Sequence, residues 1–172
     1  WNGAGIYCIQ SSSPTITNCN ISENTTVTND LMCGGGIYCG NTSPTITGCT
    51  INKNAVGDWG FGGGIYCRDS ASPTITGCTI SENSAGKEGD GGGIYCRDSS
   101  SPAISDCIIS KNFTGNMGQA GGIYAQSSSF EISNCIISGN SSDNGGGMLC
   151  TAVLMTNCNL SGNAALYKLS LI

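Results

Sequence analysis

Two pairs of charged residues, Arg68-Asp69 and Arg97-Asp98, occupy the same place in neighbouring repeats of the chain. Carboxylates beside a basic side chain are groups with which polysaccharide-cleaving enzymes perform acid–base chemistry. If the repeats stack, Arg68 is also placed to reach Asp98. The chain has no histidine, however, and its eleven acidic residues are spread thinly. We therefore interpret the pairs as exposed ion pairs worth less than about 1 kcal/mol each, and expect no catalytic residues and no enzyme activity.

Four aspartates lie in the segments that precede the glycine-rich strings of the chain: Asp30, Asp58, Asp90 and Asp143. Calcium is the ion that such carboxylates would hold. Their distances from the following glycines differ, and none of them lies in a metal-binding loop pattern. We interpret them as turn-forming residues and expect neither a metal site nor a cofactor.

Eleven of the twelve cysteines fall at two repeated positions. The first series is Cys8, Cys39, Cys67, Cys96 and Cys150, with Ala125 in the remaining repeat, and the second is Cys19, Cys49, Cys78, Cys107, Cys135 and Cys158. Three interpretations stay open: buried free thiols that act as small hydrophobes, disulfides between stacked repeats, and a metal site. The last is poorly supported, because the chain has no C-x-x-C motif and no histidine. Cys33 lies outside both series.

A series of tyrosines marks a possible contact surface: Tyr7, Tyr38, Tyr66, Tyr95 and Tyr124. Alternation along a strand places these rings on the outer face, where stacked aromatics form a stripe for a sugar, a neighbouring protomer or a covering loop. Stacking that only stiffens the sheet is the alternative. Threonine pairs at 15/17, 45/47 and 74/76 form a second outward array. This array predicts an ice-binding surface as a third functional possibility, although it is interrupted from residue 103 onward.

All of these series follow from an internal repeat. The strings GAGIYC, GGGIYC (three times), AGGIYA and GGGMLC recur at offsets of 31, 28, 29, 29 and 25 residues. A period in this range indicates a solenoid rather than a single globular core. Within each repeat, three short period-2 alternations predict three β-strands.

Two series of small polar residues would shape each coil. The residue before each second-series cysteine tolerates left-handed backbone geometry and predicts a one-residue corner between two strands. These corner residues are Asn18, Gly48, Gly77, Asp106, Asn134 and Asn157. Six further asparagines would stack into a ladder of side-chain amides. The ladder residues are Asn24, Asn54, Asn83, Asn112, Asn140 and Asn163.

The fold that these patterns predict is all-β, a right-handed parallel β-helix of six coils with three short strands per coil. The coils span residues 1–163, and residues 164–172 form a tail that acts as a partial cap or as a strand for contacts between ends. Stacked at about 4.8 Å, six coils give a rod about 29 Å tall. The segment between the ladder asparagine and the glycines varies in length, and we expect it to loop away from the stack.

The repeat resembles those of two known groups of proteins. Ile21-Ser-Glu-Asn24, Ile80-Ser-Glu-Asn83 and Ile109-Ser-Lys-Asn112, each followed by a Gly-Gly-x-Ile string, are similar to the F-x-x-N and G-G-[AVLI] motifs of chlamydial polymorphic outer-membrane proteins. The string SPTITxCxIS looks like the β-helix repeat of the pectin-lyase-like superfamily. The resemblance implies a β-helix fold and a secreted or surface-displayed passenger or adhesin, or else a polysaccharide lyase.

Composition limits the partners. A net charge of −5 with six basic residues argues against nucleic acid, and no apolar run is long enough to predict a membrane-spanning helix. We expect an extracellular or cell-surface structural or adhesive solenoid that associates with itself, head to tail, into a filament. The flanking coils of a longer chain would be an equivalent partner. The alternative is a polysaccharide-binding or lyase-type module with a carbohydrate partner.

Overall fold

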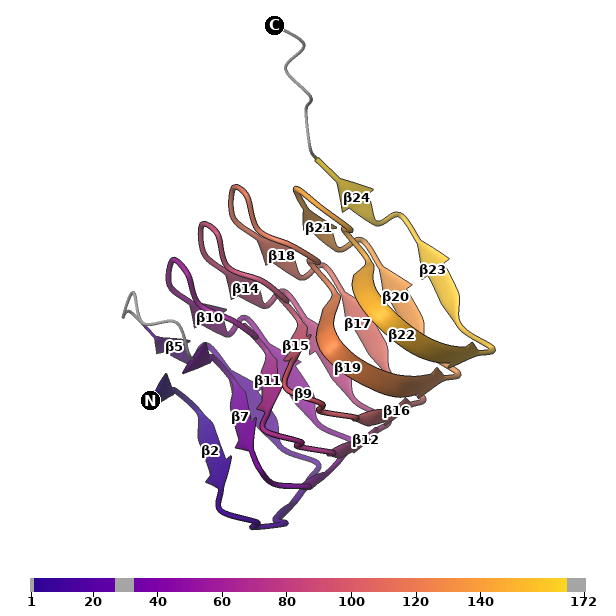
Figure 1. Cartoon of the computed structure of the whole chain (residues 1–172). Coiled ribbons are helices and arrows are strands. Elements are labelled where there is room, and N and C mark those ends of the chain that lie inside the picture. Colours follow the sequence, from indigo (N-terminus) through magenta and orange to yellow (C-terminus); the bar gives the residue numbers. More distant parts are fainter. Residues whose placement is uncertain (1, 27–32, 167–172) are drawn as a thin grey trace, which may run out of the picture.

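The structure is a computed structural model that describes residues 2–26 and 33–166. Expectations for Asp30, for the side chain of Cys33 and for residues 167–172 of the predicted tail lie outside the described part. The described strands pair in parallel and wind around one axis, with each repeat stacked on the next (Figure 1). The predicted parallel β-helix is confirmed.

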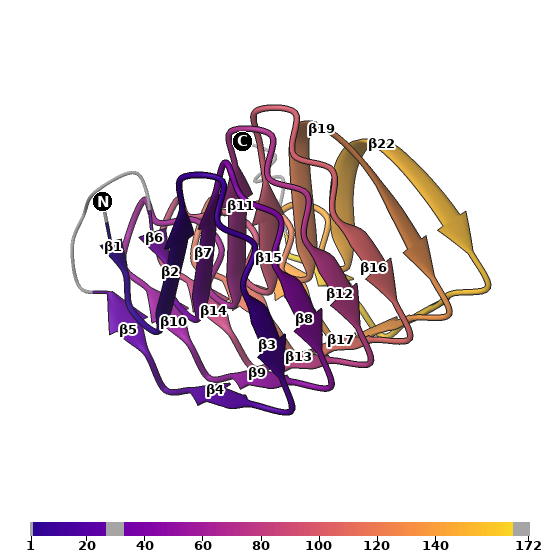
Figure 2. The ribbon, with the colours of Figure 1, turned by 90° about the horizontal axis from the view of Figure 1, so that it is seen from below.

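Three strands in each coil make up two large sheets (Figure 2). The first strands of the coils are β2 (Ile6–Ile9), β7 (Ile37–Gly40), β11 (Ile65–Arg68), β15 (Ile94–Cys96), β19 (Ile123–Ser133) and β22 (Met148–Thr156). The second strands are β3 (Thr15–Thr17), β8 (Thr45–Thr47), β12 (Thr74–Thr76) and β16 (Ala103–Ser105). In the last two coils, the C-terminal parts of β19 and β22 take the position of the second strand. The third strands form a separate six-stranded sheet: β4 (Asn20–Ser22), β9 (Thr50–Asn52), β13 (Thr79–Ser81), β17 (Ile108–Ser110), β20 (Ile136–Ser138) and β23 (Asn159–Ser161).

Each coil also contains a two-residue strand that the sequence pattern did not predict. These strands follow the ladder asparagines and form a further six-stranded sheet: β5 (Thr25–Thr26), β10 (Ala55–Val56), β14 (Ser84–Ala85), β18 (Phe113–Thr114), β21 (Ser141–Ser142) and β24 (Ala164–Ala165). At the first coil, β1 (Asn2–Gly3) pairs with β6 (Cys33–Gly34). Two residues are too few to show an alternation of apolar and polar side chains, so periodicity could not reveal them.

The core consists of columns of like residues. Ile46, Ile75 and Ile104 occupy equivalent positions of paired strands, and so do Ile51, Ile80 and Ile109 on the third strand. All six are buried. The glycine strings let neighbouring coils approach one another, because a Cβ atom on Gly64 would lie 2.5 Å from the carbonyl oxygen of Gly93. The strings are therefore packing positions as well as strand entries.

The variable segments project outward from the coils, as predicted, and they also stack on one another (Figure 1). Segments of neighbouring coils hydrogen-bond to one another, with the Trp59 N–H donating to the Lys87 carbonyl (2.9 Å) and the Glu88 N–H to the Asn116 carbonyl (2.8 Å). Isolated bridges link Phe61, Asp90, Gln119 and Asn144 in order. Similar lengths of 29 residues between the middle repeats allow the turns to superimpose, so they extend the stack outward (Figure 1).

Candidate functional site

The predicted corner is present in every coil. All six corner residues have a positive φ, between 52° and 63°. A second left-handed corner, which sequence reasoning missed, lies directly before the ladder asparagine. It is formed by Glu23, Lys53, Glu82, Lys111, Gly139 and Gly162. Glu and Lys are not typical of this backbone geometry, so only the two glycines carried a signal.

The predicted asparagine ladder is also present. Each Nδ2 donates to the Oδ1 of the next coil at 2.8–3.0 Å, from Asn24 through to Asn163. Each backbone N–H from Asn24 to Asn140 donates to the same oxygen of the next coil. The second Nδ2 hydrogen of Asn83 donates to the Ile51 carbonyl of the previous coil (2.9 Å). The four inner amides are fully buried and fully hydrogen-bonded, so the column stabilises the stack instead of burying unpaired polar groups.

The tyrosines lie in the predicted outward column but do not form an exposed stripe. Tyr38, Tyr66 and Tyr95 are 0–2% exposed and form an apolar cluster of their own, together with Phe61. Ring centroids of successive tyrosines are 4.6–5.3 Å apart, and Phe61 stacks on Tyr95 at 4.7 Å. Phe61 belongs to the variable segment, which covers these rings. Of the three occupants that the sequence left open, a covering segment is the one found at the central tyrosines, whereas Tyr7 is 38% exposed.

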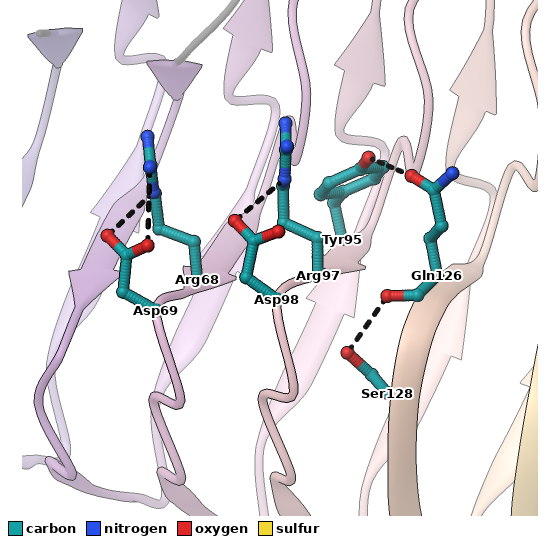
Figure 3. A network of polar contacts seen from close by, with 7 residues as sticks. All are labelled: Arg68, Asp69, Tyr95, Arg97, Asp98, Gln126 and Ser128. Atoms are coloured by element: carbon teal, nitrogen blue, oxygen red, sulfur yellow. Dashed lines mark hydrogen bonds and ion pairs between the residues drawn. The ribbon is translucent and has the colours of Figure 1, made fainter.

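The two arginine–aspartate pairs lie beside this cluster (Figure 3). Arg68 Nε is 2.8 Å from Asp69, and Arg97 Nε is 2.9 Å from Asp98, so each arginine pairs within its own coil. Tyr95 donates a hydrogen bond to Gln126 Oε1 of the next coil (3.3 Å). Burial raises the pKa of Tyr66 to about 12, although both nearby arginines oppose the rise. The Tyr66 phenol therefore keeps its proton at neutral pH, and it lies near two arginines that are ion-paired with aspartates.

The described cysteines are free thiols, and most are buried in the predicted columns. In the second series the backbone N–H of Cys49 donates to the sulfur of Cys78 (3.4 Å), and the Cys78 N–H donates to the sulfur of Cys107 (3.3 Å). Burial raises the pKa of Cys49 and of Cys150. Hydrogen bonds with Cys107 lower the pKa of Cys78 and of Cys135. The free and mostly buried thiols agree with the first of the three interpretations, in which they act as small hydrophobes.

The acidic residues of the variable segments act within the fold. Asp58 accepts the Lys87 N–H (2.9 Å), Asp90 accepts the Gln119 N–H (2.9 Å) and Asp143 accepts the Met117 N–H (2.6 Å). Each carboxylate thus ties its turn to the turn of a neighbouring coil. Within residues 2–26 and 33–166, no three acidic or cysteine side chains are grouped so as to hold a metal ion.

The threonine array is in register over three coils. Thr15, Thr45 and Thr74 are paired neighbours on the outer face and are exposed. Ala103 and Glu131 continue the column, as the sequence indicated. The array is therefore three threonines long in the axial direction.

A groove that the sequence did not predict opens on the outer face of the last three coils. Its volume is about 420 Å³, and its lining includes Ala103, Ser129, Glu131, Ala152 and Leu154. Serines 99, 101 and 127 line an adjoining hollow. The groove lies where β22 is shorter than β19, with a register shift between Ala125 and Ser129. The short final offset of 25 residues was the available sequence signal.

Both ends of the described solenoid leave core positions uncovered. At the first coil, Cys19 is exposed and a hollow of about 360 Å³ is lined by Ile6, Ile21 and Asn24. At the last coil, Leu160 is 47% exposed, and Met155 and Cys158 are half-buried.

The comparisons with known proteins identify the class. A family model described as "Right handed beta helix region" matches residues 1–166. The chain therefore belongs to the right-handed β-helix family, in agreement with the predicted hand of the coil and with the pectin-lyase-like superfamily. No curated protein and no solved structure matches the chain. In the part of the chain that the structure describes, no helix is long and apolar enough to cross a membrane.

Proposed function

We propose that this protein is a structural β-solenoid of the cell surface or extracellular space that extends end to end into longer rods, and that it is not an enzyme. The observation that carries the proposal is the contrast between sides and ends. Along the sides, the isoleucine columns are buried and the ladder amides are paired. At the ends of the described part, Cys19 and Leu160 are exposed, and β4 and β23 are the outermost strands of their sheet. Open strand edges with apolar neighbours are templates for a further strand.

The test is electron microscopy combined with sedimentation of the purified chain over a range of concentrations. Extension predicts rods whose length grows with concentration. Monodisperse short particles at every concentration would contradict the proposal. Detection of the chain on intact cells with an antibody, compared with permeabilised cells, tests the proposed location.

A carbohydrate-binding module is the second candidate, and the groove favours it. Hydroxyl groups of Ser101 and Ser129 beside the carboxylate of Glu131 are suited to hydrogen-bonding a sugar. A glycan array, followed by an assay for cleavage of acidic polysaccharides with and without calcium, separates this candidate from the first. Binding that is lost on changing Glu131 to Ala and is unaffected by Glu23→Ala would support it.

A further inference from the structure

The threonine array is part of a regular pattern of hydroxyl groups on the outer face of the second strands. Its members are Thr15, Thr17, Thr45, Thr47, Thr74 and Thr76, of which four are exposed and two are half-buried. The strands that carry them, β3, β8 and β12, pair in register. Ser43 and Ser72 lie two residues before the array and are also exposed, and the Ser72 N–H donates to the Thr42 carbonyl (3.2 Å), which continues the same register. Hydroxyl groups therefore recur both along each coil and from coil to coil.

The threonine array is held rigidly by the coils. The Thr45 N–H donates to the Pro14 carbonyl of the previous coil (3.0 Å). Ile46 and Ile75, each between the two threonines of its strand, are fully buried, so the threonines on either side point away from the core. The branched Cβ atom of threonine also restricts rotation about χ1. The hydroxyl groups thus keep nearly fixed positions, and little freedom is lost when they bind a ligand.

The spacing of the threonine array points to a ligand that is itself a lattice. Neighbouring strands are about 4.8 Å apart, and alternate residues of one strand are about 6.7 Å apart. These two distances are close to the repeats of the oxygen atoms on a prism face of ice. A threonine hydroxyl both donates and accepts hydrogen bonds, as a water molecule does. The strands β3, β8 and β12 contain no charged residue that would hold the nearby water in a different arrangement.

We propose that the threonine array binds the surface of ice, with its hydroxyl groups taking the place of water molecules in the outermost layer. Ala103 and Glu131 bound the site, because they continue the column of Thr74 with a methyl group and a carboxylate. The outer face of the third strands offers no equivalent array, because Thr79 pairs with Ile108 and Ile108 pairs with Ile136. This function belongs to the side of the solenoid and is independent of end-to-end extension.

Slow freezing of a dilute solution onto a cold surface tests the proposal, because a chain that binds ice enters the ice whereas other solutes are excluded. The unaltered chain should be enriched in the ice fraction relative to an unrelated globular protein in the same solution. Thr45→Tyr and Thr74→Tyr each place a bulky ring on the threonine array, and each should lose this enrichment. Tyrosine is favourable in β-strands, and circular dichroism confirms that each variant is folded.

Thr50→Tyr is the matched control, because Thr50 is an exposed threonine of the same coil as Thr45 but lies on the third strand. This variant should enter the ice as the unaltered chain does. Exclusion of the unaltered chain from the ice would overturn the proposal. Ice binding that Thr45→Tyr leaves unchanged, or that Thr50→Tyr reduces equally, would place the contact elsewhere and contradict the proposed site.

Discussion

Asn83 shows how one side chain can hold three coils together. Its amide donates to Asn112 and to Ile51, and its oxygen accepts two hydrogen bonds from Asn54. All of these groups lie in the core, where an unpaired polar group is costly. A polar residue that is buried in a β-helix is here a structural group, and its type at a fixed spacing was enough to predict it.

Asn83→Ala should strongly destabilise the fold. It leaves two donors of Asn54 without their acceptor and removes one hydrogen bond each from Asn112 Oδ1 and the Ile51 carbonyl. We expect a loss of about 3 kcal/mol in the free energy of unfolding. Denaturant titration followed by circular dichroism measures this loss. Asn116→Ala, at an exposed turn position, should cost less than about 0.5 kcal/mol. Equal losses in the two variants would show that the ladder does not stabilise the stack.

Asp90 should make stability depend on pH. Burial raises the pKa of its carboxyl from 3.8 to about 6. The folded state therefore disfavours the charged form, so stability should rise as the pH falls from about 7 through 6 toward 4. Asp90→Asn, which keeps the acceptor for the Gln119 N–H, should gain about 1 kcal/mol at pH 7.5 and lose this part of the pH dependence. Melting curves from pH 4 to 8 measure it, with Asp58→Asn as the exposed control.

The strands and the first corner were largely predictable because similar residue types recur at the same position of each coil. Ile, Thr and Cys alternate at the same place in every coil, and Gly, Asn or Asp always fills the first corner. The second corner was not recognisable, because Glu and Lys fill it in the first four coils. The burial of Tyr66 could not be read from alternation either, since a residue that points out of the coil can still be covered by another segment, here one that contains Phe61.

The corner at Gly77 provides a test of backbone geometry alone. A Cβ atom there would meet no atom closer than 3.9 Å, so space is available. Gly77→Ala should nevertheless cost about 1 kcal/mol, because φ is +63°. Asp106→Gly, at the equivalent corner of the next coil, should be neutral or stabilising. Paired unfolding titrations check this, and a neutral Gly77→Ala would mean that the corner tolerates any residue.

At the scale of the whole molecule, the stability is approximately the sum of the stabilities of single coils and of the contacts between neighbouring coils. Each coil contacts only its neighbours, so coils in the middle are held on two sides and end coils on one. In the third-strand column, Leu160 of the last coil is half exposed, whereas Ile80 of a middle coil and Ile21 of the first coil are buried. The groove beside β22 is a property of this scale, because residues of three successive coils line it and no single repeat can encode it.

The rate of thiol labelling should report how deeply each cysteine is buried and whether chains associate end to end. Cys19 is exposed while Cys67 and Cys96 are buried, so a maleimide probe should label Cys19 first and the middle thiols only on unfolding. Mass mapping of the labelled peptides measures the order. In concentrated samples the labelling of Cys19 should slow, because the adjoining copy covers it. Labelling of Cys67 as fast as Cys19 would contradict the packed core.

The ladder has one more consequence, for the choice of an expression host. Asn24-Thr-Thr26, Asn112-Phe-Thr114 and Asn140-Ser-Ser142 are acceptor sequences for N-linked glycans. The sugar would be attached to the same nitrogen that donates to the next coil. A chain glycosylated at Asn112 or Asn140 before it winds could not close those coils, so hosts without this modification should give the folded protein.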